Sequence, residues 1–283
     1  MPDYRIKSVH AVQVQSRRHN MAVSARVETM DGAVGKALCY AGVSVGTHEV
    51  HFQYDGGNRW GGLGCMSAVR NVNTIIADTI LGMDVRNQFE IDQAMLSIQG
   101  NGSASVGGNA IAAVSAAVLK AGAAATQMPL YRYIGGENAC MLPVPGAPAF
   151  SGGERWGGAV HTHGNKPTGA FQCFGYDSFS EASSAAWDMY HLFAKELEKR
   201  GVTEGDWFFY RIPAGIFKHS DEELFELMAD VIHKTGNDGK AGIQIDVAAD
   251  CYYDRNHKRY RGLFSKEERD RDQLLAYYLK LID

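Results

Sequence analysis

Asp246 is the carboxylate in this sequence that could most clearly take part in chemistry. It ends the apolar segment Ile243-Gln-Ile-Asp. Such a segment is typical of a buried strand, and in β/α folds the C-terminal ends of the strands carry the active site. A carboxylate at that place can bind a hard cation, most often Mg²⁺. The same residue could instead cap a helix or lie on the surface, so one strand-end aspartate leaves both interpretations open.

Further polar groups lie in segments that are rich in glycine. Ser44 could close over a phosphate or a metal, or it could simply be a polar loop residue. His161 and His163 alternate as they would on one face of a strand, so they could bind a metal together. A solvated histidine pair in a loop is the alternative. Cys173 falls on a predicted strand, where a free thiol is commonly buried and inert.

The composition excludes several classes of protein. The 283 residues carry 28 Lys and Arg against 32 Asp and Glu, and we find no basic stripe of the kind that binds nucleic acid. No apolar run is long enough to predict a signal peptide or a membrane span. The five cysteines are scattered and form no C-x-x-C pair, which indicates reduced thiols and favours a cytoplasmic protein.

Periodicity predicts how the first half of the chain is built. Apolar and polar residues alternate from Val23 to Glu28, and Asp31-Gly32 predicts a hairpin whose return strand covers 33–39. A glycine-rich loop over 41–64 is typical of a functional lid. Four helices should follow, over 69–80, from about 84 to 96, over 109–125 and over 129–134. The third consists almost entirely of small residues and should be buried on most sides.

The second half alternates between strands and helices. Residues 171–174 and 242–248 are predicted strands, and the Ser-x-x-Glu pattern opens helices at Ser178, Ser220 and Ser265. This alternation predicts a parallel sheet or a β/α barrel. Too few residues follow Gly136 for the eight strands of a closed barrel. We therefore expect an open edge that is covered by a second chain, by a self-partner or by a different sheet closure.

Read together, several segments resemble the enolase family, and the likeness runs along nearly the whole chain. Ser44, Gly46 and His48-Glu49 resemble the mobile loop of that family, and Ile245-Asp-Val-Ala-Ala249 resembles its first metal strand. The most specific pieces are Val106-Gly-Gly-Asn-Ala-Ile111, Pro129-Leu-Tyr-Arg-Tyr-Ile-Gly-Gly136, Ala68-Val-Arg-Asn-Val-Asn73 and Leu142-Pro-Val-Pro145.

The resemblance implies an α/β protein with two domains. Residues 1–138 would form an N-terminal α+β enolase-type capping domain, and residues 139–283 the first part of an enolase-type β/α barrel. Family members abstract a proton next to a carboxylate and hold the enolate on Mg²⁺, because cations stabilise the developing negative charge. Enolases interconvert 2-phosphoglycerate and phosphoenolpyruvate, the phosphopyruvate hydratase reaction of glycolysis.

The resemblance also assigns individual site residues. Asp246 matches the first metal carboxylate, and Ser44 matches the loop serine that reaches the second metal. Arg155 stands in place of an active-site histidine, and Cys173 in place of a substrate-site glutamate. The position of the glutamate that acts as the acid falls on Trp207. In a shifted register, Glu204 would stand there as a catalytic residue.

The other functional positions of the family lie beyond Asp283. These are the remaining two metal carboxylates, the base lysine, a second active-site histidine and another substrate lysine. We therefore expect weak or no hydratase activity from the isolated chain.

Three functions follow from this pattern. The chain could be an enolase-type Mg²⁺-dependent lyase, acting alone or with a complementary C-terminal barrel half. It could be a non-catalytic enolase-like binding or assembly subunit, as three substituted active-site positions suggest, and a homodimer is then expected. It could also be a related lyase that acts on another phosphorylated or phosphonate carboxylate, with Arg155 holding an anionic group. None of the three involves nucleic acid or a membrane.

Overall fold

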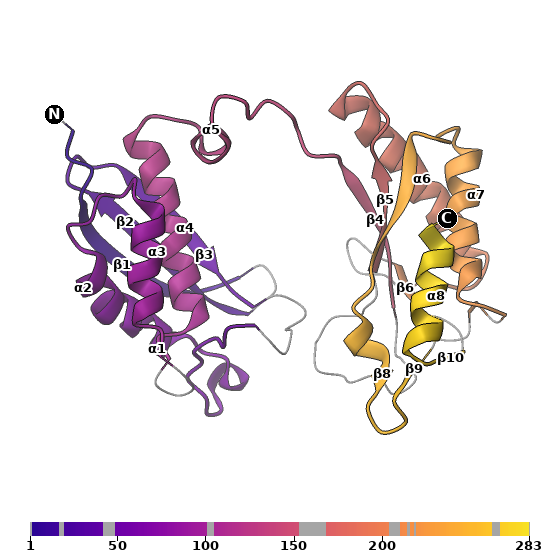
Figure 1. Cartoon of the computed structure of the whole chain (residues 1–283), viewed down its shortest axis with the longest axis horizontal. Helices are drawn as coiled ribbons and strands as arrows, with labels where there is room; N and C mark the ends of the chain where they lie inside the picture. Colours follow the sequence, from indigo (N-terminus) through magenta and orange to yellow (C-terminus); the bar gives the residue numbers. More distant parts are fainter. Residues whose placement is uncertain are drawn as a thin grey trace. The chain divides into compact units, whose positions relative to one another are not determined.

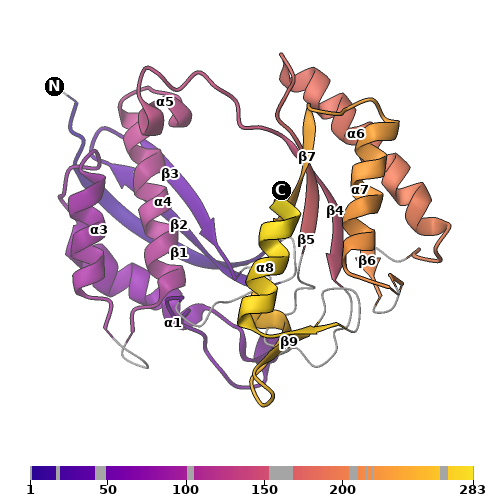
Figure 2. The same cartoon turned by 45° about the vertical axis from the view of Figure 1, so that its right-hand side comes forward.

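The chain forms two compact units, Met1–Cys140 and Met141–Asp283. The computed structural model describes residues 2–16, 20–41, 49–100, 105–152, 168–203, 210–213, 216–217, 219–261 and 267–282. Figures 1 and 2 show how each unit combines helices with a sheet. Each unit has its own buried apolar cluster, so each is described by itself.

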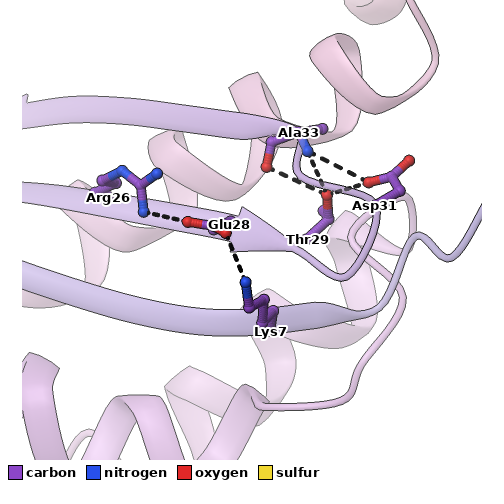
Figure 3. Close-up of polar contacts among 6 residues, drawn as sticks. All are labelled: Lys7, Arg26, Glu28, Thr29, Asp31 and Ala33. Carbon is purple, nitrogen blue, oxygen red and sulfur yellow. Dashed lines mark hydrogen bonds and ion pairs between the residues drawn. The ribbon is translucent and has the colours of Figure 1, made fainter.

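The first unit contains a three-stranded antiparallel sheet in the order β1-β2-β3, formed by β1 (Ile6–Gln15), β2 (Met21–Thr29) and β3 (Val34–Cys39). The predicted alternation is confirmed, because Val23, Ala25 and Val27 are at most 1% exposed. The predicted hairpin is also present. The Thr29 hydroxyl accepts a hydrogen bond from the Ala33 amide at 2.9 Å in the turn between β2 and β3 (Figure 3).

Helices follow this sheet in the sequence. They are α1 (Met66–Asn71), the π-helix η2 (Val72–Ile76), α2 (Ala77–Ile80), α3 (Gln88–Ser97), α4 (Gly108–Ala125) and α5 (Leu130–Gly135), with a short 3-10 turn η1 (Arg59–Gly62) before them. Of these, α1, η2, α2 and α4 contact the strands of the sheet. As predicted, most of α4 is covered, and its fully buried residues include Ala113, Ala117 and Ala121. This helix is long and apolar enough to cross a membrane. Its packing against β2 and β3 identifies it as the core helix of the unit.

Two asparagines of the segments that resemble enolases bind the backbone in this unit. The Gln53 amide donates to Asn109 Oδ1 at 3.0 Å, and Asn109 Nδ2 donates to the Gln53 carbonyl at 3.1 Å. In the same way, Asn73 accepts from the Ala11 amide at 2.6 Å and donates to the Ala11 carbonyl at 3.1 Å. Each side-chain amide thus satisfies both polar groups of one backbone position, which fixes a loop and an edge strand.

The second unit is built on a four-stranded sheet in the order β6-β4-β5-β7, formed by β4 (Gly146–Gly152), β5 (Thr168–Cys173), β6 (Tyr210–Ile212) and β7 (Ala241–Asp246). The expectation of a parallel sheet was wrong for β5, which is antiparallel to both β4 and β7. Only β4 and β6 pair in parallel within this sheet as described. Alternation with helices predicts parallel neighbours, but β5 pairs with the strand described just before it in sequence, and such strands commonly pair antiparallel.

Two helices, α6 (Phe179–Glu198) and α7 (Glu222–Lys234), pack against one face of this sheet (Figures 1 and 2). Phe171 of β5 contacts Phe193 of α6 with ring centroids 5.7 Å apart, and Phe150 of β4 contacts Phe225 of α7 at 6.4 Å. These edge-to-face contacts form the centre of the second apolar cluster. Phe150, Phe171 and their neighbours on that face therefore point toward the helices.

The helix starts predicted near Ser178 and Ser220 show two kinds of capping. Ser178 caps α6, and its side chain accepts from the Glu181 amide at 3.2 Å. At the start of α7 the carboxylate of Glu223 accepts from the amides of His219 and Ser220, at 2.7 and 3.2 Å. Both arrangements satisfy amides that have no partner inside the helix.

The predicted start of the last helix at Ser265 and Glu268 was wrong. Glu268 belongs to β10 (Glu268–Arg269), which pairs with β9 (Arg259–Arg261), and β9 pairs with β8 (Tyr253–Asp254) after the turn η4 (Ala249–Tyr252). Helix α8 (Arg271–Ile282) begins directly after Asp270 in the sequence. Asp270 and Gln273 each donate a backbone amide to the other's side chain at 2.9 Å. This reciprocal box, together with the pairing of β10, sets the later start.

Candidate functional site

The strand register of the second unit brings three oxygen-bearing side chains into one row across the sheet. Thr168, the first residue of β5, lies directly opposite Asp246, the last residue of β7. On its other side Thr168 lies opposite Ser151 of β4. Cross-strand partners have Cβ atoms about 4.5–5.5 Å apart, so Thr168 neighbours both Ser151 and Asp246, which lie on either side of it. Below, this set is called the oxygen row.

All three members of the oxygen row lie on the sheet face that is opposite to α6 and α7. Phe150 points toward the helices, so the next residue, Ser151, points away from them. Phe171 also points toward the helices, so Thr168, three residues earlier, is on the other face. Asp246 is the cross-strand partner of Thr168, so it lies on this face as well. Ser151 is 4% exposed, Thr168 is half-buried and Asp246 is exposed.

The oxygen row also lies at the end of the sheet where ligands bind in related folds. Ser151 and Asp246 are at or near the C-terminal ends of β4 and β7, which run in the same direction because both are antiparallel to β5. In α/β folds, ligands bind at the C-terminal ends of parallel strands. The position of Asp246 thus agrees with its strand-end placement in the sequence, and Thr168 supplies the neighbouring hydroxyl on β5.

The structure does not bring Cys173 to Asp246. Cys173 lies opposite Ala241, five residues along β7 from Asp246, which corresponds to about 17 Å along the strand. It also occupies the helix-facing side of the sheet and is only 2% exposed. This burial raises the pKa of the Cys173 thiol, so that the unreactive thiol form dominates. A ligand that contacts Asp246 from the face opposite to α6 and α7 cannot also touch this sulfur.

Two amide side chains lie next to the oxygen row on the same face of the sheet. Gln172 of β5 donates a hydrogen bond to the side-chain oxygen of Gln244 on β7. Gln244 is two residues before Asp246 and shares its face. This pair ties β5 to β7 beside the oxygen row and supports the register that brings Thr168 to Asp246.

Several predicted site residues lie outside the described residues. They are Ser44, Arg155, Glu204 and Trp207, together with His161 and His163. Their roles as metal, substrate or catalytic residues remain predictions. Of the residues that the resemblance assigned to the site, the structure describes only Asp246 and Cys173, and it separates the two.

The donor set of the oxygen row can be compared with what a metal ion requires. Among the described residues, no group of three or more His, Cys, Asp or Glu side chains is arranged to hold a metal ion. The oxygen row offers one carboxylate and two hydroxyl oxygens, which are hard ligands. Mg²⁺ commonly keeps several waters and binds through one or two carboxylates together with substrate oxygens. The oxygen row therefore fits a hydrated Mg²⁺ that is held by few protein ligands.

Sequence reasoning missed Thr168 and Ser151. Neither residue stands out by type. Each is placed near the site only by pairing with a strand that is distant in sequence. A signal was present in the pattern Thr168-Gly-Ala-Phe171, since Phe171 was already placed on a strand. Extending that strand backward would have put Thr168 on the face opposite to Phe171.

An α+β unit followed by a helix-covered sheet with a strand-end carboxylate defines the class of this protein as α/β, with its candidate site at the ends of strands. The model of the enolase N-terminal domain matches residues 6–134, and that of the enolase C-terminal TIM barrel domain matches residues 139–283. The chain belongs to the enolase family.

Curated relatives agree with this assignment. The chain is 36% identical to the enolase of Bifidobacterium longum subsp. infantis over 287 residues, which cover 98% of this chain and 63% of the relative. It is 35% identical to the enolase of Campylobacter jejuni and 37% identical to that of Methanopyrus kandleri, again over 98% of this chain and covering 64% of each relative. The chain thus spans less than two thirds of the length of these relatives.

Proposed function

We propose that this chain is an enolase-like protein of the phosphopyruvate hydratase family that binds Mg²⁺ and a phosphorylated carboxylate at the oxygen row. We further propose that the isolated chain interconverts 2-phosphoglycerate and phosphoenolpyruvate weakly or not at all. The observation that carries the proposal is the position of Asp246, at the C-terminal end of β7 and on the face opposite to the helices. Membership of the enolase family supplies the class of reaction.

The chemistry requires that negative charge be stabilised. A proton next to a carboxylate is very weakly acidic, and Mg²⁺ when bound stabilises the charge that develops on its removal. The carboxylate of Asp246 would hold this cation. The sheet behind the row contacts α6 and α7, so a ligand would approach Asp246 from the opposite face.

Weak activity is expected because the described site is poor in charge. Asp246 is the only carboxylate in the oxygen row, and one carboxylate holds Mg²⁺ loosely. At two further matched positions, Arg155 and Trp207 replace residues that the family uses. Arg155 could still bind the anionic end of a phosphorylated or phosphonate carboxylate.

The test combines turnover with binding. The purified chain and the Asp246→Asn variant would be incubated with 2-phosphoglycerate, with and without Mg²⁺, and phosphoenolpyruvate would be quantified. We expect product close to the blank. Mg²⁺ together with 2-phosphoglycerate should raise the thermal midpoint of the wild-type chain but not that of the variant. Clear Mg²⁺-dependent turnover contradicts the proposed inactivity, and an equal thermal shift in both proteins contradicts the site.

A second candidate function is that of a non-catalytic binding or assembly subunit. It is favoured by the roles of Asn73 and Asn109, which lie in the segments most similar to enolases and bind backbone groups of the fold. Asn71, in the same segment as Asn73, likewise donates to the Val106 carbonyl at 2.9 Å. These contacts serve the fold and involve no group of the candidate site.

This candidate predicts a defined assembly in a cytoplasmic setting, either a homodimer or a complex with a complementary C-terminal barrel half. Light scattering of the purified chain would measure its mass. A stable dimer supports the assembly role, and a well-folded monomer that binds no partner contradicts it.

A further inference from the structure

We propose that Thr168 is the residue of β5 that contacts the ligand at Asp246, and that Ser151 assists it from β4. The two hydroxyls would hydrogen-bond to water molecules or to a ligand oxygen on a Mg²⁺ held by Asp246. This inference rests on the proposed function, because it names further residues of the same site. The resemblance had pointed to Cys173 as the residue of this strand at the site, and this inference names Thr168 as the ligand-contacting residue of β5.

The position of Thr168 follows from the pairing on both of its sides. Its partners are Asp246 on one side and Ser151 on the other, and all three point away from the helices. The other two β5 residues on this face are Ala170, which has no polar side chain, and Gln172, which bonds to Gln244. Within β5, every residue of which the structure describes, Thr168 alone combines a side-chain oxygen with direct proximity to Asp246.

The contact between Gly169 and Phe150 fixes how β4 and β5 pair next to Thr168. A Cβ atom at Gly169 would lie 2.1 Å from Cε1 of Phe150, so the ring of Phe150 occupies the space above the glycine. This contact fixes the register on the helix-facing side next to both Thr168 and Ser151. The two hydroxyls are therefore held at the level of Asp246 by packing, and no movement is needed to assemble the row.

Hydroxyls suit the ligand that is expected here. A hydroxyl both donates and accepts, so it can bond to a water on a cation or to an anionic oxygen. Mg²⁺ loses its waters reluctantly, and the protein commonly contacts it through that water shell. Because Thr168 is half-buried and Ser151 is 4% exposed, hydrogen bonds made by them are partly shielded from bulk water.

The experiment measures binding of Mn²⁺, used as a paramagnetic substitute for Mg²⁺, by the loss of the free-ion spin-resonance signal. The full chain would be compared with Thr168→Val, Thr168→Ser, Ser151→Ala, Cys173→Ala and Asp246→Asn. Thr79→Val in α2, where the hydroxyl donates only to the local Ile75 carbonyl, is the matched control for removal of a hydroxyl. Circular dichroism would confirm that each variant is folded.

Loss of one hydrogen bond to the ligand should weaken Mn²⁺ binding roughly three- to tenfold in Thr168→Val. Thr168→Ser, which keeps the hydroxyl, should restore most of the affinity. Ser151→Ala should weaken binding less, and Cys173→Ala and Thr79→Val should not change it. A loss of affinity in Cys173→Ala with none in Thr168→Val overturns the inference.

Asp246→Asn separates this inference from the proposed function. If Asp246→Asn abolishes binding while Thr168→Val and Ser151→Ala leave it unchanged, the hydroxyls are not involved and only the inference fails. If Asp246→Asn leaves binding unchanged, or if the wild-type chain binds no Mn²⁺, the proposed site fails and the inference falls with it.

Discussion

Phe150 lies directly over Gly169, its neighbour across the β4–β5 pair, and the ring fills the space that a side chain at position 169 would need. A Cβ atom there would be 2.1 Å from Cε1 and 2.4 Å from Cζ of Phe150. Phe150 is itself fully buried and contacts Phe225 of α7. The ring therefore has little freedom to move aside.

Gly169→Ala should destabilise the second unit by about 1–3 kcal/mol, because the added methyl group overpacks a closed part of the core. Chemical unfolding followed by circular dichroism would measure the change. Gly242→Ala on β7 is the matched control, since a Cβ there meets only the ring of the exposed Phe174, at 3.1 Å. Equal losses of stability in the two variants would contradict the role of Phe150.

Gly35→Ala should be still more damaging to the first unit. A Cβ atom at Gly35 would lie 2.0 Å from the carbonyl oxygen of Ala117 and 2.4 Å from the amide nitrogen of Ala121 in α4. These are backbone atoms, so relief requires the helix to move off the sheet, at a cost of about 3 kcal/mol or more. Lys36→Ala, at the exposed neighbour, should change the free energy of unfolding by less than about 0.5 kcal/mol. A mild Gly35→Ala variant in chemical unfolding would show that α4 is displaced easily.

Arg269→Met should destabilise the second unit because it removes the cation beside a buried carboxylate. Arg269 Nη1 lies 2.9 Å from Oδ2 of Asp221, which is fully buried at the start of α7. Removing one member of such a pair costs about 3–5 kcal/mol. Arg271→Met, on the exposed first turn of α8, is the control and should have little effect. Thermal unfolding of the two variants side by side would reveal the difference, and equal midpoints would argue against the ion pair.

Glu28 should make the first unit sensitive to acid. Hydrogen bonds from Arg26, at 2.7 Å, and from Lys7, at 3.0 Å, lower the pKa of Glu28 below its usual value (Figure 3). A lowered folded-state pKa stabilises the fold above the pKa of the unfolded chain, and this contribution is lost as pH falls through the folded value.

Glu28→Gln should therefore be less stable than the wild type at pH 7. The difference in stability between the two proteins should narrow as pH drops below about 4. Thermal midpoints measured from pH 7 to pH 3 test this. Glu226→Gln, on the exposed face of α7, should track the wild type at every pH. A gap that stays constant down to pH 3 would contradict the role of Glu28.

The described cysteines should differ widely in reactivity. Cys140 is exposed, whereas Cys65 and Cys173 are buried. Burial raises the pKa of Cys65 to about 11 and also raises that of Cys173, so both carry little thiolate at pH 8. Brief alkylation followed by peptide mass analysis should label Cys140 first, and Cys65 and Cys173 only after unfolding. Rapid labelling of Cys173 in the native chain would place it at an accessible surface.

Local patterns in the sequence by themselves determined most of the first unit and the family of the protein. The alternation of Val23, Ala25 and Val27, the hairpin at Asp31-Gly32 and the small-residue helix 109–125 predict its sheet and its core helix. Each of these features depends on residues close together in sequence. Periodicity reports them directly, because the period of a helix or strand is set within a few residues.

Only the tertiary structure decided which residues surround Asp246 in the candidate site and where the last helix starts. Ser265-x-x-Glu268 and Asp270-x-x-Gln273 are both plausible capping boxes, and the pairing of β10 with β9 selects the second. The direction and register of β5 place Thr168, and not Cys173, beside Asp246. Both outcomes depend on hydrogen bonds and packing between segments that are distant along the chain, and no local periodicity encodes which strands pair or in which register.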